Sequence, residues 1–188
     1  GPLDSAADDT TASEGGEIVW GATSDAALNQ VIEVGTRGAC LAAMVTIADI
    51  SQVTQFQLGF RQNEAFVDAA TYAGYTIWNT VGLTTTDGVI TSSQEVSEAT
   101  DTDTSPGTWT DGQRRALKVC VSAGGVPTAY YSAASPDSDA PIYLPITMTE
   151  TGSTLTAAQA MVPFISYIAA GTDGADPFIN WLQLEPYR

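Results

Sequence analysis

The chain of 188 residues contains no histidine, and lysine and arginine together number only six. Without histidine, one chain cannot build a Ser-His-Asp or Cys-His nucleophilic pair, nor a His-ligated zinc, copper or iron site. Against the six basic residues stand 22 Asp and Glu, which give a formal net charge of -16. Phosphate binding needs clusters of Lys and Arg, so we expect no nucleic-acid partner. An anionic membrane would repel the same surface, so we expect no membrane partner either.

Cysteine and long apolar runs are also scarce. The two cysteines, Cys40 and Cys120, both lie in apolar runs. That placement is compatible with two buried thiols and with one disulfide, so it leaves the redox compartment open. No apolar run approaches the roughly 18 residues that a transmembrane helix needs.

The beginning of the chain is expected to lie outside the folded domain. The start, Gly1-Pro2-Leu3-Asp4-Ser5, looks like the remnant of a protease-cleavage and cloning site. Residues 6–16 are small and polar with three acids, which is typical of a disordered lead-in or a tether. We therefore predict a disordered acidic tail over 1–16 and a single domain over 17–188, a length that suits one domain.

Strand patterns dominate the rest of the chain. Apolar and polar residues alternate in 55–61, 117–122 and 142–149, whereas 41–48 is apolar on both faces and indicates a central strand. About ten strands predict an all-β, two-sheet antiparallel sandwich. Further strands are expected at 17–20, 29–34, 74–80, 88–96, 126–132, 160–168 and 178–185. Turns are expected at Asp87-Gly88, Asp111-Gly112, Gly124-Gly125 and Asp173-Gly174; solvated loops at 97–113 and 132–141; and helical turns only at 24–32 and 155–161.

Carboxylates are the first candidates for chemistry. Asp101 and Asp103 lie in the acidic segment 97–113, and oxygen-rich loops are what calcium uses. The spacing matches no EF-hand loop, so solvated acidic loops are the alternative to a calcium site. No other cofactor is expected. Because no acid/base pair can be assembled from local spacing, we predict that the protein is not an enzyme.

Aromatic residues are the second candidates. Trp109 lies in the acidic segment and is the best candidate for an exposed ring on which a sugar could stack. Tyr130 and Tyr131 are adjacent in a predicted strand, so one faces inward and the other outward, where it could line a binding face. Trp78 and Trp181 lie in predicted strands and fit the core better. Packing in the core or at an interface is the alternative for all of these side chains.

Basic residues cluster in one place. Arg114 and Arg115 stand close to Lys118, the only lysine of the chain. They either offset nearby carboxylates or dock an acidic neighbouring subunit, which makes Arg114 and Arg115 candidate partner contacts.

Residues 109–131 resemble a stretch of concanavalin A-like and laminin-G-like sandwiches. Trp109 with Asp111-Gly112 forms the turn, Leu117 to Val121 the first strand, Gly124-Gly125 a second turn, and Tyr130-Tyr131 the aromatic end of the next strand. The resemblance extends over most of 17–187, and it implies a concanavalin A-like jelly-roll fold.

The order of several short motifs also resembles structural proteins of tailed viruses. These motifs are Gly59-Phe60-Arg61, Glu64-Ala65-Phe66, Leu117-Lys118-Val119, Val162-Pro163-Phe164 and Trp181. This resemblance implies a non-enzymatic virion surface protein, a capsid decoration or head- or tail-fibre component, bound to capsid proteins and forming homo-oligomers such as trimers. The alternative is a carbohydrate-binding module or receptor-binding domain with a glycan partner. Either protein would be extracellular or on the virion surface. The many acids and the single lysine favour a halophilic or marine source.

Overall fold

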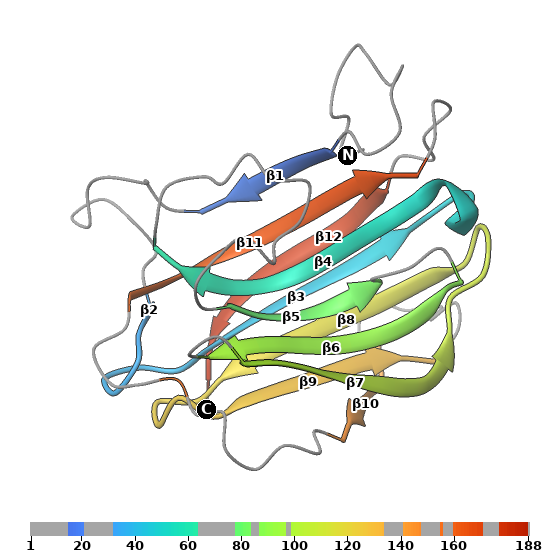
Figure 1. Ribbon diagram of the computed structural model, residues 1–188. Coiled ribbons are helices and arrows are strands. Elements are labelled where there is room, and N and C mark those ends of the chain that lie inside the picture. The colour runs from blue at the N-terminus through green and yellow to red at the C-terminus, as the bar shows by residue number, and fades with distance from the viewer. Residues whose placement is uncertain are drawn as a thin grey trace.

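The computed structural model describes residues 15–20, 32–63, 78–83, 87–96, 99–133, 141–147, 155, 160–170 and 177–187. These residues form two antiparallel sheets that pack face to face (Figure 1), which confirms the predicted sandwich. The only helix among them is the short 3₁₀ helix η2 (Ile50–Gln52). Within this part of the chain no helix is long and apolar enough to cross a membrane.

The two sheets differ in size. The seven-stranded sheet runs in the order β1-β11-β4-β5-β6-β7, with β2 also on β11; the five-stranded sheet runs in the order β10-β9-β8-β3-β12. In the first sheet the bounds are β1 Gly15–Val19, β2 Ile32–Glu33, β4 Val53–Gln62, β5 Trp78–Leu83, β6 Val89–Val96, β7 Ala99–Thr108 and β11 Ala160–Ala169. In the second they are β3 Ala39–Thr46, β8 Arg114–Val121, β9 Pro127–Ser132, β10 Tyr143–Ile146 and β12 Phe178–Pro186.

The core lies between the sheets and follows from the period-2 pattern. On β4, Phe56, Leu58 and Phe60 are fully buried, and they meet inward residues of β8 such as Leu117 and Val119. Successive side chains of a strand point to opposite faces. The residues that alternate with this core therefore line the two outer faces of the sandwich.

Trp109 belongs to this core, so its predicted exposure is wrong. Its side chain is 1% exposed. The ring meets Phe56 edge-on, with ring centroids 6.2 Å apart, and Trp109 Nε1 donates a hydrogen bond to the carbonyl oxygen of Gln113 at 2.9 Å. A buried indole that has both apolar contacts and a hydrogen-bond acceptor is a stabilising core residue.

The predicted loop over 97–113 is also wrong, because β7 occupies most of it. Threonine recurs at every second position, at Thr100, Thr102 and Thr104, and this β-branched alternation favours a strand. Thr102 pairs with Ser93 and Thr104 with Thr91 of β6. The pairing with β6 outweighs the acidic character that suggested a solvated loop.

Most other predicted elements coincide with strands, with shifted ends. Strand β1 begins at Gly15, two residues inside the predicted tail, and β5 begins at Trp78 rather than at residue 74. The predicted turns around residues 88, 112 and 125 are confirmed, since Gly88, Gly112 and Gly125 all have positive φ. The turn at 173–174 and most of 24–32, 132–141 and 155–161 lie outside the described residues.

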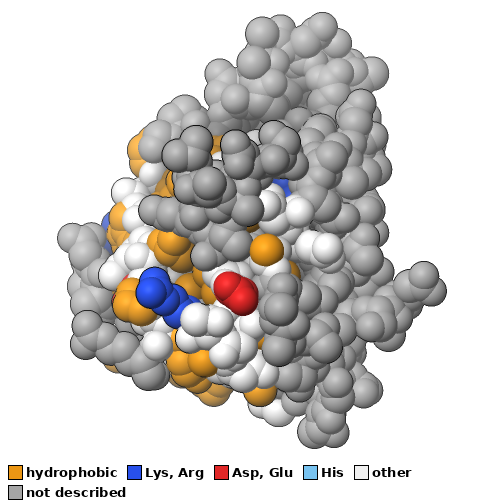
Figure 2. Space-filling view, turned by 90° about the vertical axis from the view of Figure 1, so that its left-hand side faces the viewer, with side chains coloured by type: hydrophobic (Ala, Val, Ile, Leu, Met, Phe, Trp, Pro, Cys, Tyr) orange, Lys and Arg blue, Asp and Glu red, His pale blue; other side chains and the backbone are white. Residues whose placement is uncertain are grey.

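Charge is distributed unevenly along the chain. Five of the six basic residues but fewer than half of the acids fall within the described ranges. Figure 2 shows one end of the sandwich, where hydrophobic and basic groups are more prominent than acidic ones among the described side chains. The preference for a halophilic source stays a prediction.

Candidate functional site

A pocket of about 370 Å³ opens on the outer face of the five-stranded sheet. That volume lies within the range of small-molecule sites, which is roughly 300–1,000 Å³. The lining residues come from β3, β8, β9, β10 and the end of β12, and they are Cys40, Lys118, Cys120, Tyr130, Tyr143, Glu185, Pro186 and Tyr187.

Strand register brings these side chains to one face. On β8, Leu117, Val119 and Val121 enter the core, so Lys118 and Cys120 point outward. Lys118 is paired with Tyr130 of β9, and Cys120 with Cys40 of β3. The neighbouring register pairs Cys40 with Glu185 of β12. Five residues from four strands, Cys40, Lys118, Cys120, Tyr130 and Glu185, therefore become neighbours on the outer surface.

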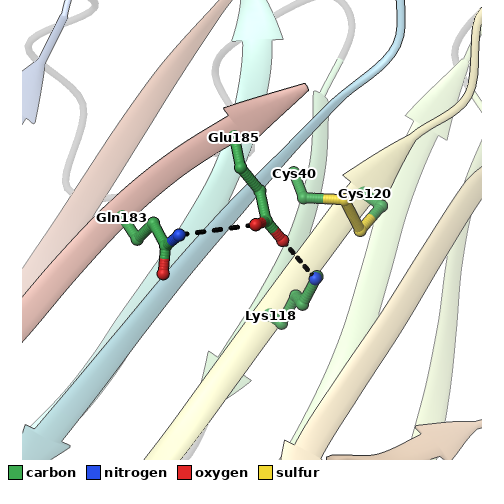
Figure 3. The surroundings of a disulfide bond; sticks show 5 residues. All are labelled: Cys40, Lys118, Cys120, Gln183 and Glu185. Carbon is green, nitrogen blue, oxygen red and sulfur yellow. Dashed lines mark hydrogen bonds and ion pairs between the residues drawn. A yellow bond between two sulfur atoms is a disulfide. The ribbon is translucent and has the colours of Figure 1, made fainter. Parts of the chain in front are cut away.

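The floor of the pocket is a disulfide. Cys40 and Cys120 are joined by an S–S bond of 2.07 Å between β3 and β8, as Figure 3 shows. Both cysteines are almost fully buried. The structure thus selects the disulfide from the two states that the sequence left open, and no free cysteine remains.

Above the disulfide, Lys118 and Glu185 form an ion pair. Lys118 Nζ lies 2.5 Å from Glu185 Oε1, with the lysine side chain 22% and the glutamate side chain 37% exposed. Figure 3 shows the Glu185 side chain reaching from β12 across β3 toward Lys118 on β8. In the register, Ala42 of β3 pairs with Lys118 on one side and with Gln183 on the other. The ion pair therefore joins β8 to β12 across the intervening strand β3.

Tyrosines form the walls of the pocket. Lys118 Nζ lies 5.7 Å from the centroid of the Tyr143 ring, within cation–π range. Tyr130 meets Tyr143 edge-on, with centroids 6.5 Å apart and ring planes at 70°. Burial, and secondarily the charge of Glu185, raise the pKa of Tyr143 to about 12. Tyr187 is 40% exposed, and its backbone N–H donates to the Gly38 carbonyl oxygen at 3.0 Å.

This arrangement provides binding chemistry. The tyrosine rings offer apolar faces, Lys118 offers hydrogen-bond donors, and Glu185 offers acceptors. Glu185 is the only carboxylate among the described residues that line the pocket. General acid and base catalysis on a glycoside uses two carboxyl groups, so the described lining lacks that constellation.

The two adjacent tyrosines behave as the alternation predicted. Tyr131 is 5% exposed and belongs to the core, so it is unavailable for a ligand. Tyr130 faces outward and lines the pocket. Of the three residues predicted to bind a ligand, Trp109 and Tyr131 are core residues and Tyr130 alone reaches the site.

The arginine hypothesis fails for Arg115. This side chain is 5% exposed, and its guanidinium donates to the backbone carbonyl oxygens of Ser132, at 2.8 Å, and of Thr108. Burial lowers the pKa of the Arg115 guanidinium from its ordinary value. Arg115 therefore ties the end of β7 to β9 and is not a surface contact. Arg114 lies half-buried on β8, and its role in a subunit contact stays a prediction.

The acidic loop on which the calcium hypothesis was based is largely a strand. Asp103 lies on β7 and is 7% exposed, so it is not part of a solvated acidic loop. The side chain of Asp101 lies outside what the structure describes. Among the described residues, no group of three or more Asp, Glu or Cys side chains is arranged to hold a metal ion.

Two charged residues of the site, Lys118 and Glu185, are not among the ligand-binding residues that the sequence predicts. Lys118 stands out in the sequence only as part of a basic cluster and Glu185 only as the end of a predicted strand, whereas Tyr143 is one of the aromatic residues that the sequence offers for a sugar site. Tyr143 and Glu185 occupy outward positions of alternating segments, as Lys118 does. That signal was present in the sequence, but the strand order that unites them was not.

The outer face of the seven-stranded sheet is polar as well, but it is withdrawn from solvent. Gln57 is fully buried, and its Nε2 donates to the Leu83 carbonyl oxygen at 2.7 Å. Arg61 Nε and one terminal nitrogen donate to Glu17 Oε1 at 3.1 and 2.8 Å. These donors are internally engaged, whereas Tyr130, Lys118 and Glu185 are partly exposed. We therefore place the candidate site on the five-stranded sheet.

Comparison with known proteins identifies the fold. No protein-family model and no curated protein sequence matches the chain, but solved structures do. The carbohydrate recognition domain of Emp47p matches with a TM-score of 0.56 and 9% identity, over 93% of this chain and 79% of that one. Peanut lectin matches with a TM-score of 0.54 and 10% identity, over 96% and 84%. The protein has the concanavalin A-like sandwich fold.

The other matches are more varied. A protein of unknown function from Shewanella oneidensis MR-1 gives a TM-score of 0.54 at 10% identity over 81% of this chain, which spans only 59% of that protein. The GH43 protein BlXynB from Bacillus licheniformis gives 0.51 at 12% identity, over 91% and 32%. Identities this low show the fold alone. They leave the absence of enzymatic activity as a prediction, and they give no support to a viral origin.

Proposed function

We propose that this protein is a non-catalytic, lectin-like protein that binds glycans in the pocket on the outer face of its five-stranded sheet. The observation that carries the proposal is the meeting of Tyr130 and Tyr143 with the Lys118–Glu185 pair in a pocket of about 370 Å³. Sugars have apolar C–H faces and a rim of hydroxyl groups. They are recognised where aromatic faces stand beside a few convergent polar groups.

Two further observations support the proposal. The fold is shared with lectins, including a carbohydrate recognition domain. The disulfide between Cys40 and Cys120 fits a protein of an oxidising compartment such as the cell exterior, where glycans are displayed.

The hypothesis of a virion surface protein has weaker support. The motifs behind it consist largely of sandwich-forming residues: Phe60 of β4, Leu117 and Val119 of β8, and Phe164 of β11 are all buried. A shared order of buried residues follows from a shared fold, whatever the function. Binding to capsids without binding to any glycan would favour that hypothesis.

A glycan array followed by titration calorimetry tests the proposal. We expect a defined glycan to bind, and Tyr130→Ala to weaken its binding at least tenfold while the melting temperature changes little, because stacking on an aromatic face is lost. Phe178→Ala is the matched control, since Phe178 is an exposed aromatic residue at the far end of β12. Equal binding by both variants, or the absence of any glycan ligand, would contradict the proposal.

A further inference from the structure

The Lys118–Glu185 pair balances the charge of the pocket. Among the described residues that line it, Lys118 and Glu185 are the only charged ones, and they lie in direct contact at 2.5 Å. Glu185 Oε2 also accepts from Gln183 Nε2 at 3.4 Å, which orients the carboxylate (Figure 3). The lysine ammonium is therefore neutralised locally, and its position is further fixed by the face of Tyr143.

A neutral and an acidic sugar would meet this pair differently. An ammonium group has three donors and a carboxylate has about four acceptor sites. A sugar hydroxyl can thus accept from Lys118 and donate to Glu185 while the pair stays intact. A sugar carboxylate would need Lys118 as its counter-ion, and would have to approach Glu185, a like charge. The long-range field adds to this preference, because the chain carries a formal net charge of -16 and repels anions.

We infer that the Lys118–Glu185 pair is a charge selector that admits uncharged glycans and rejects glycans carrying uronic, sialic or sulfated groups. This inference rests on the proposed glycan-binding function, and it assigns Glu185 the role of a specificity-determining residue. Glu185 rejects acidic ligands by keeping Lys118 occupied. Specificity of this kind needs a repulsive element as well as an attractive one.

The substitution Glu185→Gln separates this role from a structural one. It keeps the shape of the side chain and an oxygen acceptor but removes the negative charge, so Lys118 becomes available as a counter-ion. We expect the variant to bind acidic glycans about two- to fivefold more tightly than the unmodified protein does, in line with a partly exposed ion pair. Neutral glycans should be bound within about twofold of their original affinity. The gain should shrink at high salt, because screening weakens a partly exposed pair.

The test uses a glycan array with matched pairs of oligosaccharides that differ by one hexose or the corresponding hexuronic acid. Glu33→Gln is the control, because it removes the same charge from an exposed position on the other sheet. Preference of the unmodified protein for the neutral member, reversed or reduced only in Glu185→Gln, supports the inference. Binding of both members with equal affinity, or an unchanged preference in Glu185→Gln, overturns the selector but leaves glycan binding in place. If folded protein binds no glycan of either kind, both proposals are wrong.

Discussion

Cys40 and Cys120 lie directly opposite each other on neighbouring strands, and their disulfide forms the floor of the candidate site. The bond joins residues 80 positions apart in the sequence. It holds together β3 and β8, and β8 also carries Lys118 of the ion pair. The same bond is therefore placed to affect both the stability of the fold and the shape of the pocket.

We expect removal of the disulfide to destabilise the protein. The double substitution Cys40→Ala with Cys120→Ala should lower the free energy of unfolding by about 2–5 kcal/mol, because closing a long loop restricts the unfolded chain. Urea unfolding followed by tryptophan fluorescence measures the change. Reductant should shift the unmodified protein by a similar amount and leave the double variant unchanged. Equal sensitivity of both proteins to reductant would contradict this account.

Tyr143 should titrate later than an ordinary tyrosine. Burial and the Glu185 carboxylate raise its pKa to about 12, against about 10 for a free phenol. Because the folded state holds the proton more tightly, the stabilising contribution is complete below about pH 10 and is lost as the pH rises to about 12. Tyrosinate absorbance in an alkaline titration should contain one late step that Tyr143→Phe removes. Glu185→Gln should move that step to lower pH, because it removes a charge that raises the pKa of Tyr143. If the late step persisted in Tyr143→Phe, it would belong to another tyrosine.

Trp109 should be a major determinant of stability. It is buried against Phe56, and its indole N–H is bonded to a backbone carbonyl. Trp109→Ala should lower the free energy of unfolding by about 3–5 kcal/mol, since it removes a large buried side chain and leaves a cavity. Trp109→Phe keeps most of the volume and should cost less. If chemical denaturation showed Trp109→Ala to be nearly neutral, the core position of this residue would be wrong.

The sequence allowed the fold to be predicted better than the site. Alternation around Phe56, Leu58 and Phe60 marks one buried face of a strand whatever its neighbours are, so most strands were found. Trp109 and β7 were misassigned because acids and a Ser-Pro pair are typical of loops, while pairing with β6 depends on contacts remote in the sequence. The site was found only at Tyr130, because its other members meet through the order of five strands. Local patterns do not encode that order.

The buried ion pair of the seven-stranded sheet should contribute to the stability of the protein. The side chains of Arg61 and Glu17 are 1% and 6% exposed and lie 2.8 Å apart. Arg61→Ala should lower the free energy of unfolding by about 3–5 kcal/mol, because it leaves a buried carboxylate without this partner. The double substitution Arg61→Met with Glu17→Leu should be milder than Arg61→Ala, since it removes both charges. Thermal and urea unfolding of the two proteins measure the order, and a double variant that is less stable than Arg61→Ala would reverse it.

Alanine substitutions at three glycines should lower the stability by increasing amounts, which separates the effect of backbone strain from that of crowding. Gly124 has open surroundings, with its nearest neighbour 3.7 Å from an added Cβ, so Gly124→Ala should be almost neutral. Gly112 has φ +67° and nothing within 4 Å of an added Cβ, so Gly112→Ala should cost only the left-handed conformation, about 1–2 kcal/mol. Gly88 has φ +75°, and an added Cβ would lie 2.1 Å from the Trp109 carbonyl oxygen. Gly88→Ala should therefore cost more than Gly112→Ala, because the β7 end must move away from the turn. Chemical denaturation of the three variants gives the order of their free energies of unfolding. If Gly88→Ala were as stable as Gly112→Ala, the backbone around Trp109 would move away from the new methyl group without loss of stability.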